Sequence, residues 1–90
     1  MHVKSGSYTG TGVAQSPVTS LAFTPKALII KGGANIGVFR TDTMAADSAK
    51  PLSGATALAT GCITSLDANG FTIGTDARTN ANGTVYRWLA

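Results

Sequence analysis

Short stretches in which apolar and polar residues alternate, separated by turn-forming residues, cover most of the chain. The pattern is clearest in the last third, where residues 62–66 and 71–74 flank the sequence Asp-Ala-Asn-Gly at residues 67–70. Asn-Gly supplies the left-handed residues that tight hairpin turns need, and Asp67 can cap the turn by accepting hydrogen bonds from the backbone that follows. The pattern therefore predicts a β-hairpin over residues 62–74.

A second Ala-Asn-Gly sequence, at residues 81–83, follows the first after thirteen residues and precedes a strand predicted over residues 84–89. This spacing fits a β-meander. Alternate residues of the strand lie on opposite faces: Thr84, Tyr86 and Trp88 on one, and Val85, Arg87 and Leu89 on the other. One face must meet the core, and aromatic side chains on an exposed face would mark an interface.

Residues 26–31 form the most apolar stretch and are predicted to be the central strand, buried on both faces. The sequence Gly-Gly-Ala-Asn at residues 32–35 gives a turn into a strand predicted over residues 36–41, so these two strands form a second hairpin. Pro17 restricts residues 13–19 to a sheet edge or to the start of a strand. The chain thus contains six or seven short strands, which predicts an all-β fold: a small antiparallel β-sandwich or a jelly-roll-like barrel.

Residues 1–12 are predicted to form an N-terminal arm that precedes a single β domain over residues 13–90. In this arm, hydroxyl residues keep a period of two around Tyr8. Two interpretations are open: a flexible terminus, or an edge strand in which Tyr8 docks on a neighbouring chain. The period of two favours the edge strand.

Composition narrows the class of protein further. Only 12% of the residues are charged and Glu is absent, which excludes a charged disordered tail and a coiled coil. A lone small domain normally carries more surface charge, so we expect other chains to cover part of this surface. The net charge of +3 comes from bases scattered along the chain, whereas nucleic-acid binders gather theirs in a stripe. The excess therefore favours a partner of negative potential and not a nucleic acid.

Candidate catalytic and metal-binding residues are scarce. Cys62 is the only cysteine and His2 the only histidine, so neither a Cys–His pair nor a Ser-His-Asp triad is plausible. The sequence Asp-Ala-Asn-Gly resembles the start of a calcium loop, but such a loop needs a Glu that the chain lacks. The first residues lack the apolar segment of a signal peptide, and the longest aliphatic run, residues 27–30, is too short to span a bilayer. We expect no enzyme activity, no metal or other cofactor, and no membrane association.

Residues 42–60 show no clear strand pattern and are predicted to form a long surface loop with one helical turn near Met44. Loops of this length in small domains are usually functional, so this loop is the first candidate for contact with a partner, and the arm is the second. We expect most of the aromatic residues to lie in the core, because a chain of 90 residues needs every large side chain to fill it. If one or two of them are exposed, we expect these to be Tyr8 and Tyr86, as contact anchors. The predicted interface residues are Ser5, Ser7, Tyr8, Thr9, Thr11, Met44, Leu52, Leu58 and Tyr86.

Three segments of the chain carry patterns that are more specific than alternation. Residues 23–31, Phe-Thr-Pro-Lys-Ala-Leu-Ile-Ile-Lys, follow the pattern F-x-P-x-x-(V/I/L)-x-(V/I)-K, and residues 65–74 form a second such segment. Residues 80–90 follow the closing pattern N-x-x-G-x-x-Y-x-(W/Y)-x-A. Together these segments resemble the small β-domains of tailed-bacteriophage virion proteins. The resemblance covers about residues 23–90 apart from the middle loop.

This resemblance implies a function that composition does not. Because the domain stands here without other modules, it is most similar to a capsid decoration (cement) protein. The resemblance implies a non-enzymatic virion structural protein, made in the host cytoplasm, that lies on the outer capsid surface and bridges neighbouring capsid subunits. Its expected partners are the major capsid protein and further copies of itself, as a dimer or trimer. The alternative is a phage tail or fibre component that binds a receptor or a glycan.

Overall fold

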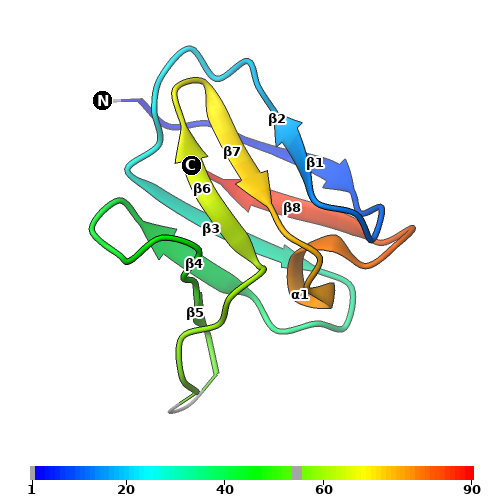
Figure 1. The fold of residues 1–90 in the computed structure, drawn as a ribbon. Coiled ribbons are helices and arrows are strands. Elements are labelled where there is room, and N and C mark those ends of the chain that lie inside the picture. The colour runs from blue at the N-terminus through cyan, green and yellow to red at the C-terminus, as the bar shows by residue number, and fades with distance from the viewer. Residues whose placement is uncertain (1, 54–55) are drawn as a thin grey trace.

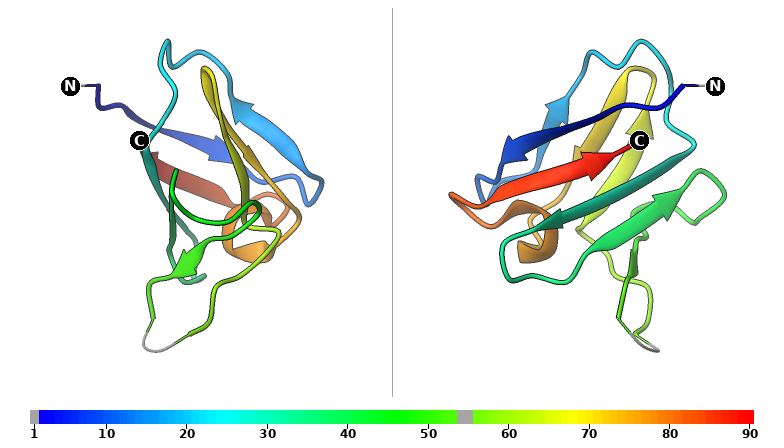
Figure 2. Two further views of the ribbon diagram at one scale, coloured as in Figure 1. Left: turned by 60° about the vertical axis from the view of Figure 1, so that its left-hand side comes forward. Right: turned by 180° about the vertical axis from the view of Figure 1, so that it is seen from behind.

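The computed structural model describes residues 2–53 and 56–90. Within them the chain forms eight strands and one short helix, in this order: β1 (Ser5–Thr9), β2 (Gln15–Val18), β3 (Ala27–Gly32), β4 (Val38–Thr41), β5 (Lys50–Pro51), β6 (Ile63–Asp67), β7 (Gly70–Ile73), α1 (Ala77–Asn80) and β8 (Val85–Leu89). Hydrogen bonding joins the strands into a five-stranded sheet, β1-β8-β3-β4-β5, and a three-stranded sheet, β2-β7-β6. Neighbouring strands are antiparallel, and the two sheets form two layers (Figure 1 and Figure 2). The predicted all-β sandwich is therefore confirmed, with eight strands where six or seven were predicted.

The core fills the space between the two sheets, and β3 shows how the chain alternates across it. Leu28 and Ile30 are fully buried in the core, whereas Ala27 and Ile29 face outward and are exposed. The prediction that this strand is buried on both faces is wrong, because only one face of the five-stranded sheet packs against the second sheet. The predicted hairpin between β3 and β4 is confirmed, with Ile30 paired to Val38.

Aromatic side chains from both sheets meet in this core. Phe71 of β7 packs edge-on against Trp88 of β8, with ring centroids 5.5 Å apart. Tyr8 of β1 and Tyr86 of β8 stack with centroids 5.3 Å apart, and Tyr86 is completely buried. The prediction that most aromatic residues lie in the core is therefore confirmed. Tyr8 and Tyr86 are not the exposed contact anchors, because β1 and β8 both turn their aromatic residues inward.

The chain crosses from the second sheet to the first through α1, a single turn that the sequence pattern does not predict. Asp76 caps α1 by accepting a hydrogen bond from the backbone N–H of Arg78 at 2.8 Å. The hydroxyls of Tyr8 and Tyr86 donate hydrogen bonds to carbonyl oxygens of α1, both at 2.6 Å. After this crossing β8 pairs with β1 and β3 and not with β7, so the predicted β-meander is wrong.

The last residue of α1, Asn80, is fully buried and joins three parts of the fold. Its side-chain amide donates to the carbonyl oxygens of Val13 at 2.6 Å and of Gly74 at 2.8 Å. Its side-chain oxygen accepts from the backbone N–H of Thr11 at 2.8 Å and from the Gln15 amide at 3.1 Å. One asparagine of α1 thus forms hydrogen bonds with the β1–β2 connection, with the start of β2 and with the segment after β7.

The two Ala-Asn-Gly sequences form turns of different kinds. In the β6–β7 hairpin, which is confirmed, Ala68 and Asn69 make the turn without a positive φ, and Gly70 begins β7. The sequence requires glycine there for another reason: a Cβ on Gly70 would collide with the carbonyl oxygen of Val18 in β2. In the second sequence Gly83 has a φ of 81°, the left-handed conformation that favours glycine. The left-handed role expected for Asn-Gly therefore applies only to the second turn.

The predicted N-terminal arm is part of the five-stranded sheet. β1 pairs with β8 along its whole length, from Ser5 opposite Leu89 to Thr9 opposite Val85. β1 is an edge strand, as one interpretation of the arm predicted, but the strand it pairs with belongs to the same chain. The separation of an arm from the β domain at residue 12 is accordingly not seen in the fold.

The predicted long loop over residues 42–60 is partly tied to the five-stranded sheet; residues 54 and 55 of this loop lie outside the described residues. β5 interrupts the loop, and Ala49 and Ala59 exchange two backbone hydrogen bonds, at 2.9 and 2.8 Å. Turns, and not the expected helical turn, surround Met44. The buried Arg40 of β4 donates hydrogen bonds to three carbonyl oxygens of the loop: those of Met44, Ala45 and Ser48.

Candidate interaction surface

The outward side of the five-stranded sheet, which we call the outer face, is built from alternate residues of its strands. Figure 2 shows this sheet nearest the viewer in its right-hand panel. Its exposed residues on the three strands β1, β8 and β3 are Ser5, Ser7, Thr9, Val85, Arg87, Leu89, Ala27, Ile29 and Lys31. Half-buried residues of β4 and β5 extend the same side: Phe39, Thr41 and Lys50. These residues form a regular surface that the three-stranded sheet does not cover.

An apolar row crosses the outer face. Strand register places Leu89 of β8 beside Ile29 of β3, and Ile29 beside Phe39 of β4. Leu89 is 47% exposed and Ile29 is 43% exposed. Single exposed apolar residues are common on proteins, but apolar side chains in register on three neighbouring strands form a continuous patch. Such a patch is typical of a surface that another molecule covers.

Basic side chains flank this row. Lys31 of β3 and Arg87 of β8 occupy directly opposite positions, and Lys50 of β5 lies at one end of the row. Like charges in directly opposite positions destabilise a sheet, and the five strands contain no Asp or Glu that offsets them. Asp42, which directly follows β4, forms an ion pair with Lys26 at 3.4 Å. The outer face therefore presents a positive potential around an apolar centre.

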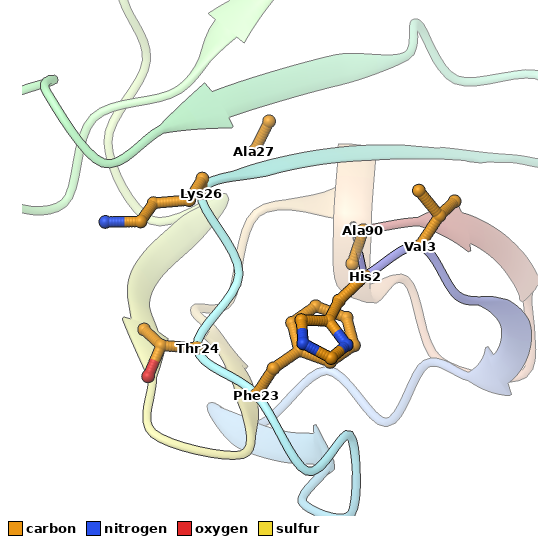
Figure 3. Close-up of a pocket in the computed structure, with 7 residues that line it drawn as sticks. All are labelled: His2, Val3, Phe23, Thr24, Lys26, Ala27 and Ala90. Atoms are coloured by element: carbon orange, nitrogen blue, oxygen red, sulfur yellow. The ribbon is translucent and has the colours of Figure 1, made fainter.

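A groove of about 450 Å³ adjoins one end of the outer face (Figure 3). The rings of His2 and Phe23 stack along it, with centroids 5.2 Å apart. Val3, Ala27 and Ala90 supply most of the remaining apolar lining. Because Ala27 belongs to both the groove and β3, the apolar surface continues from the outer face around the end of the sheet.

The structure brings only some of the predicted interface residues together. Ser5, Ser7 and Thr9 share the outer face at its β1 edge. Thr11 follows β1 and is exposed, and Leu52 lines a groove beside Lys31 at the other end of β3. The other two accessible positions, Met44 and Leu58, lie in the segments before and after β5 and not on the strands of the outer face.

The apolar row of the outer face and the bases that flank it were not among the predicted interface residues. Alternation correctly groups Arg87 with Leu89, but it does not tell which side of β8 points inward. The signal that decides this is side-chain volume: a 90-residue domain needs Tyr86 and Trp88 to fill its core, which leaves Arg87 on the outside. Ile29 was missed because the apolar run around it was interpreted as doubly buried.

Cys62, next to β6, is buried, and burial, together with the nearby Asp76 carboxylate, raises the pKa of its thiol to about 11. The thiol is therefore protonated at neutral pH and is a poor nucleophile. In residues 2–53 and 56–90, no three His, Cys, Asp or Glu side chains are grouped so that they could hold a metal ion. None of the helices in these ranges has the length and apolar character needed to cross a membrane.

Comparison of the chain with protein-family models, with curated proteins and with solved structures found no match. The outer face and the sequence patterns are therefore the features that bear on function.

Proposed function

We propose that this protein is a non-enzymatic structural protein of a virion, which decorates a bacteriophage capsid and bridges neighbouring capsid subunits. The observation that supports a role in binding another protein is the outer face, where an apolar row lies among bases. In an isolated domain, exposed apolar rows and opposed cations are unfavourable. A partner surface with an apolar centre and acidic groups around it makes both features favourable.

The choice of a capsid as the partner rests on the resemblance to phage virion domains. The residues that carry it, 23–31, 65–74 and 80–90, form β3, the β6–β7 hairpin and the α1–β8 segment. These elements form the framework of the sandwich, so the resemblance supports the type of domain and its place in a phage virion. The outer face supports the contact itself, with capsid carboxylates expected near Lys31 and Arg87.

Many copies would make such a contact effective. Each sheet face offers a small area, and a single contact of this kind is expected to be weak. A protein that contacts two neighbouring subunits gains affinity through the high effective concentration of the second site. Bridging therefore stabilises the shell more than either contact does alone.

The first test measures how many copies of this chain occur in purified source particles, by quantitative mass spectrometry against the major shell protein. A near-integer ratio to the shell protein is expected for a decoration protein. A few copies per particle would instead assign the chain to the tail or a fibre. Complete absence from the particles would overturn both assignments.

A second test places a carboxylate in the apolar row and measures binding to shells that lack this protein. Ile29→Glu is expected to weaken binding about tenfold or more, because it puts a charge into the centre of the contact. Val13→Glu is the matched control, since Val13 is 67% exposed and lies outside both sheets. Equal binding by the two variants would contradict the outer face as the contact surface.

A further inference from the structure

The side of β1 that faces away from β8 is an open sheet edge. Lys4 and Ala90 exchange two backbone hydrogen bonds, at 3.0 and 2.8 Å, and this pair sets the alternation along the β1–β8 ladder. In an antiparallel ladder, every second residue directs its N–H and C=O groups to the same neighbouring strand. Gly6 and Tyr8 therefore direct theirs toward β8, opposite Trp88 and Tyr86.

The three remaining residues of β1 direct their backbone groups away from the sheet. These are Ser5, Ser7 and Thr9, whose side chains lie on the outer face. Among the described residues, one group reaches this edge: the Gln15 amide, 3.4 Å from the carbonyl oxygen of Thr9. The edge thus presents a nearly complete set of donors and acceptors in a regular strand.

The other edge strands carry features that oppose the addition of a further strand. β5 has two residues, one of them Pro51, and β2 contains Pro17 and an irregular register. β6 also has an irregular register, and it ends in the charged Asp67. Proline, short length, irregular pairing and charge are the usual protections of a sheet edge. β1 is five residues long, pairs regularly and has none of these protections.

We propose that β1 pairs with β1 of a second copy of this chain, antiparallel and about a two-fold axis at Ser7. In this register Ser7 lies opposite Ser7 of the second copy, and Ser5 lies opposite Thr9. The outward N–H and C=O groups of all three residues then find partners across the axis. Two five-stranded sheets become one continuous sheet, with their outer faces side by side.

The composition of β1 fits a second copy of itself. The strand carries no charge, so pairing it with itself places no like charges opposite each other. Lys4, the nearest base, falls opposite Gly10 of the second copy, which has no side chain. Cross-strand hydroxyl pairs are favourable, and an isologous contact of this kind closes after two copies. The dimer does not depend on the proposed function, because it forms without a capsid.

The first experiment measures the mass of the full chain by sedimentation equilibrium over a wide range of concentrations. The mass is expected to rise from 9.1 kDa toward twice that value. Ser7→Pro removes the outward N–H but no bond to β8, because the N–H of residue 7 points away from β8. Proline is tolerated at such an edge position. This variant is expected to remain monomeric, whereas the control Ser7→Thr is expected to dimerise. A wild-type chain that stays monomeric, or a Ser7→Pro variant that dimerises like wild type, overturns the proposal.

The second experiment tests the register and does not need proline. Ser7→Cys is expected to form an intermolecular disulfide under mild oxidation, because residue 7 meets itself at the axis within the Cα separation that a disulfide allows. Ser5→Cys alone is expected to give little cross-linking, and a mixture of Ser5→Cys with Thr9→Cys is expected to give much. The buried Cys62 does not interfere. Cross-linking of Ser5→Cys alone as efficient as that of Ser7→Cys overturns the proposed pairing.

Discussion

The outward surfaces of the two sheets of this sandwich differ in their charge and in the partners of their polar side chains. On the three-stranded sheet, Asp67 accepts hydrogen bonds from the hydroxyls of Ser65 at 2.7 Å and of Thr72 at 2.6 Å. Thr72 also lies 2.8 Å from the hydroxyl of Ser16. Asp67 thus bonds to side-chain hydroxyls and not, as the sequence predicted, to the backbone of the turn. These four polar side chains are therefore paired with one another within the chain.

On the outer face of the five-stranded sheet, Lys31 and Lys50 donate hydrogen bonds to the backbone carbonyl oxygens of Gly33 and Thr56, and no carboxylate of the sheet's strands pairs with them. Lys31 and Arg87 stand directly opposite each other, and an apolar row runs beside them. The strands of this sheet carry bases and no acid, whereas the strands of the other carry one acid, Asp67, and no base. One side is therefore stable as it stands, and the other becomes favourable when a partner supplies negative charge and apolar surface.

The largest expected effect comes from Asn80, because it supports both sheets at once. Asn80→Ala leaves the buried carbonyl oxygen of Gly74, the carbonyl oxygen of Val13 and the Thr11 amide without their partners. We expect a loss of about 3–5 kcal/mol in the free energy of unfolding, measured by urea titration. Asn82→Ala, in an exposed turn, is the control and should cost less than about 0.5 kcal/mol. Similar losses for the two variants would contradict the joining role of Asn80.

The next effect distinguishes the two sheets through their glycines. In Gly70→Ala the new Cβ meets the backbone carbonyl of Val18, so β2 must move away from β7, at an expected cost of about 2–4 kcal/mol. In Gly6→Ala it lies 2.9 Å from the ring of Trp88, which can shift, and we expect about 1–2 kcal/mol. Urea titration gives both costs, and hydrogen exchange should show β2 amides exposed in the first variant only. An equal cost at both positions would contradict the distinction between backbone and side-chain contact.

Local patterns in the sequence predict much of this fold. The alternation that defines β8 and the turn residues between β6 and β7 depend on residues close together in the chain, and both are confirmed. The inward direction of Tyr8 depends instead on hydroxyl contact with α1, more than seventy residues away, and no local pattern contains it. α1 itself is a single turn, too short to show helical periodicity.

The candidate surface was harder to predict than the fold, for a related reason. An apolar residue is equally apolar in a core and in a contact surface, so Ile29 looked like part of a doubly buried strand. Only the sheet order shows that nothing in the second layer covers it. The opposition of Lys31 to Arg87 likewise arises from the pairing of β3 with β8, which are separated by most of the chain.

The two sheets should also respond at different alkaline pH. Burial raises the pKa of the Cys62 thiol, beside β6, from 9.0 to about 11, so the folded state binds this proton more tightly than the unfolded chain does. This contribution to stability is complete below pH 9 and is lost between about pH 9 and pH 11. Burial also raises the pKa of Tyr8 in β1 above its ordinary value of 10.0, so the loss from that sheet begins about one unit higher.

Urea titrations at pH 8 and pH 10 measure the contribution of the Cys62 thiol to stability. The wild-type chain is expected to lose about 1 kcal/mol between these values through Cys62. Cys62→Ala should lose much less over the same interval, although the small cavity lowers its stability at both pH values. An unchanged pH dependence in this variant would show that the thiol does not carry the effect.

The smallest effect tests the comparison of the outer surfaces most directly. Arg87→Gln removes one of two opposed cations and is expected to stabilise the chain by a few tenths of a kcal/mol at low salt. Added salt should stabilise the wild type more than this variant, because it screens the repulsion from Lys31. Thr72→Val removes a hydroxyl that contacts both Asp67 and Ser16, and it is expected to cost about 0.5–1 kcal/mol. Removal of an outward charge from the five-stranded sheet and removal of an outward hydroxyl from the three-stranded sheet thus change stability in opposite directions. Both variants are measured by urea titration at low and high salt. If both are destabilised alike, the outward side chains of the five-stranded sheet stabilise the isolated chain as much as those of the three-stranded sheet do, and the comparison is wrong.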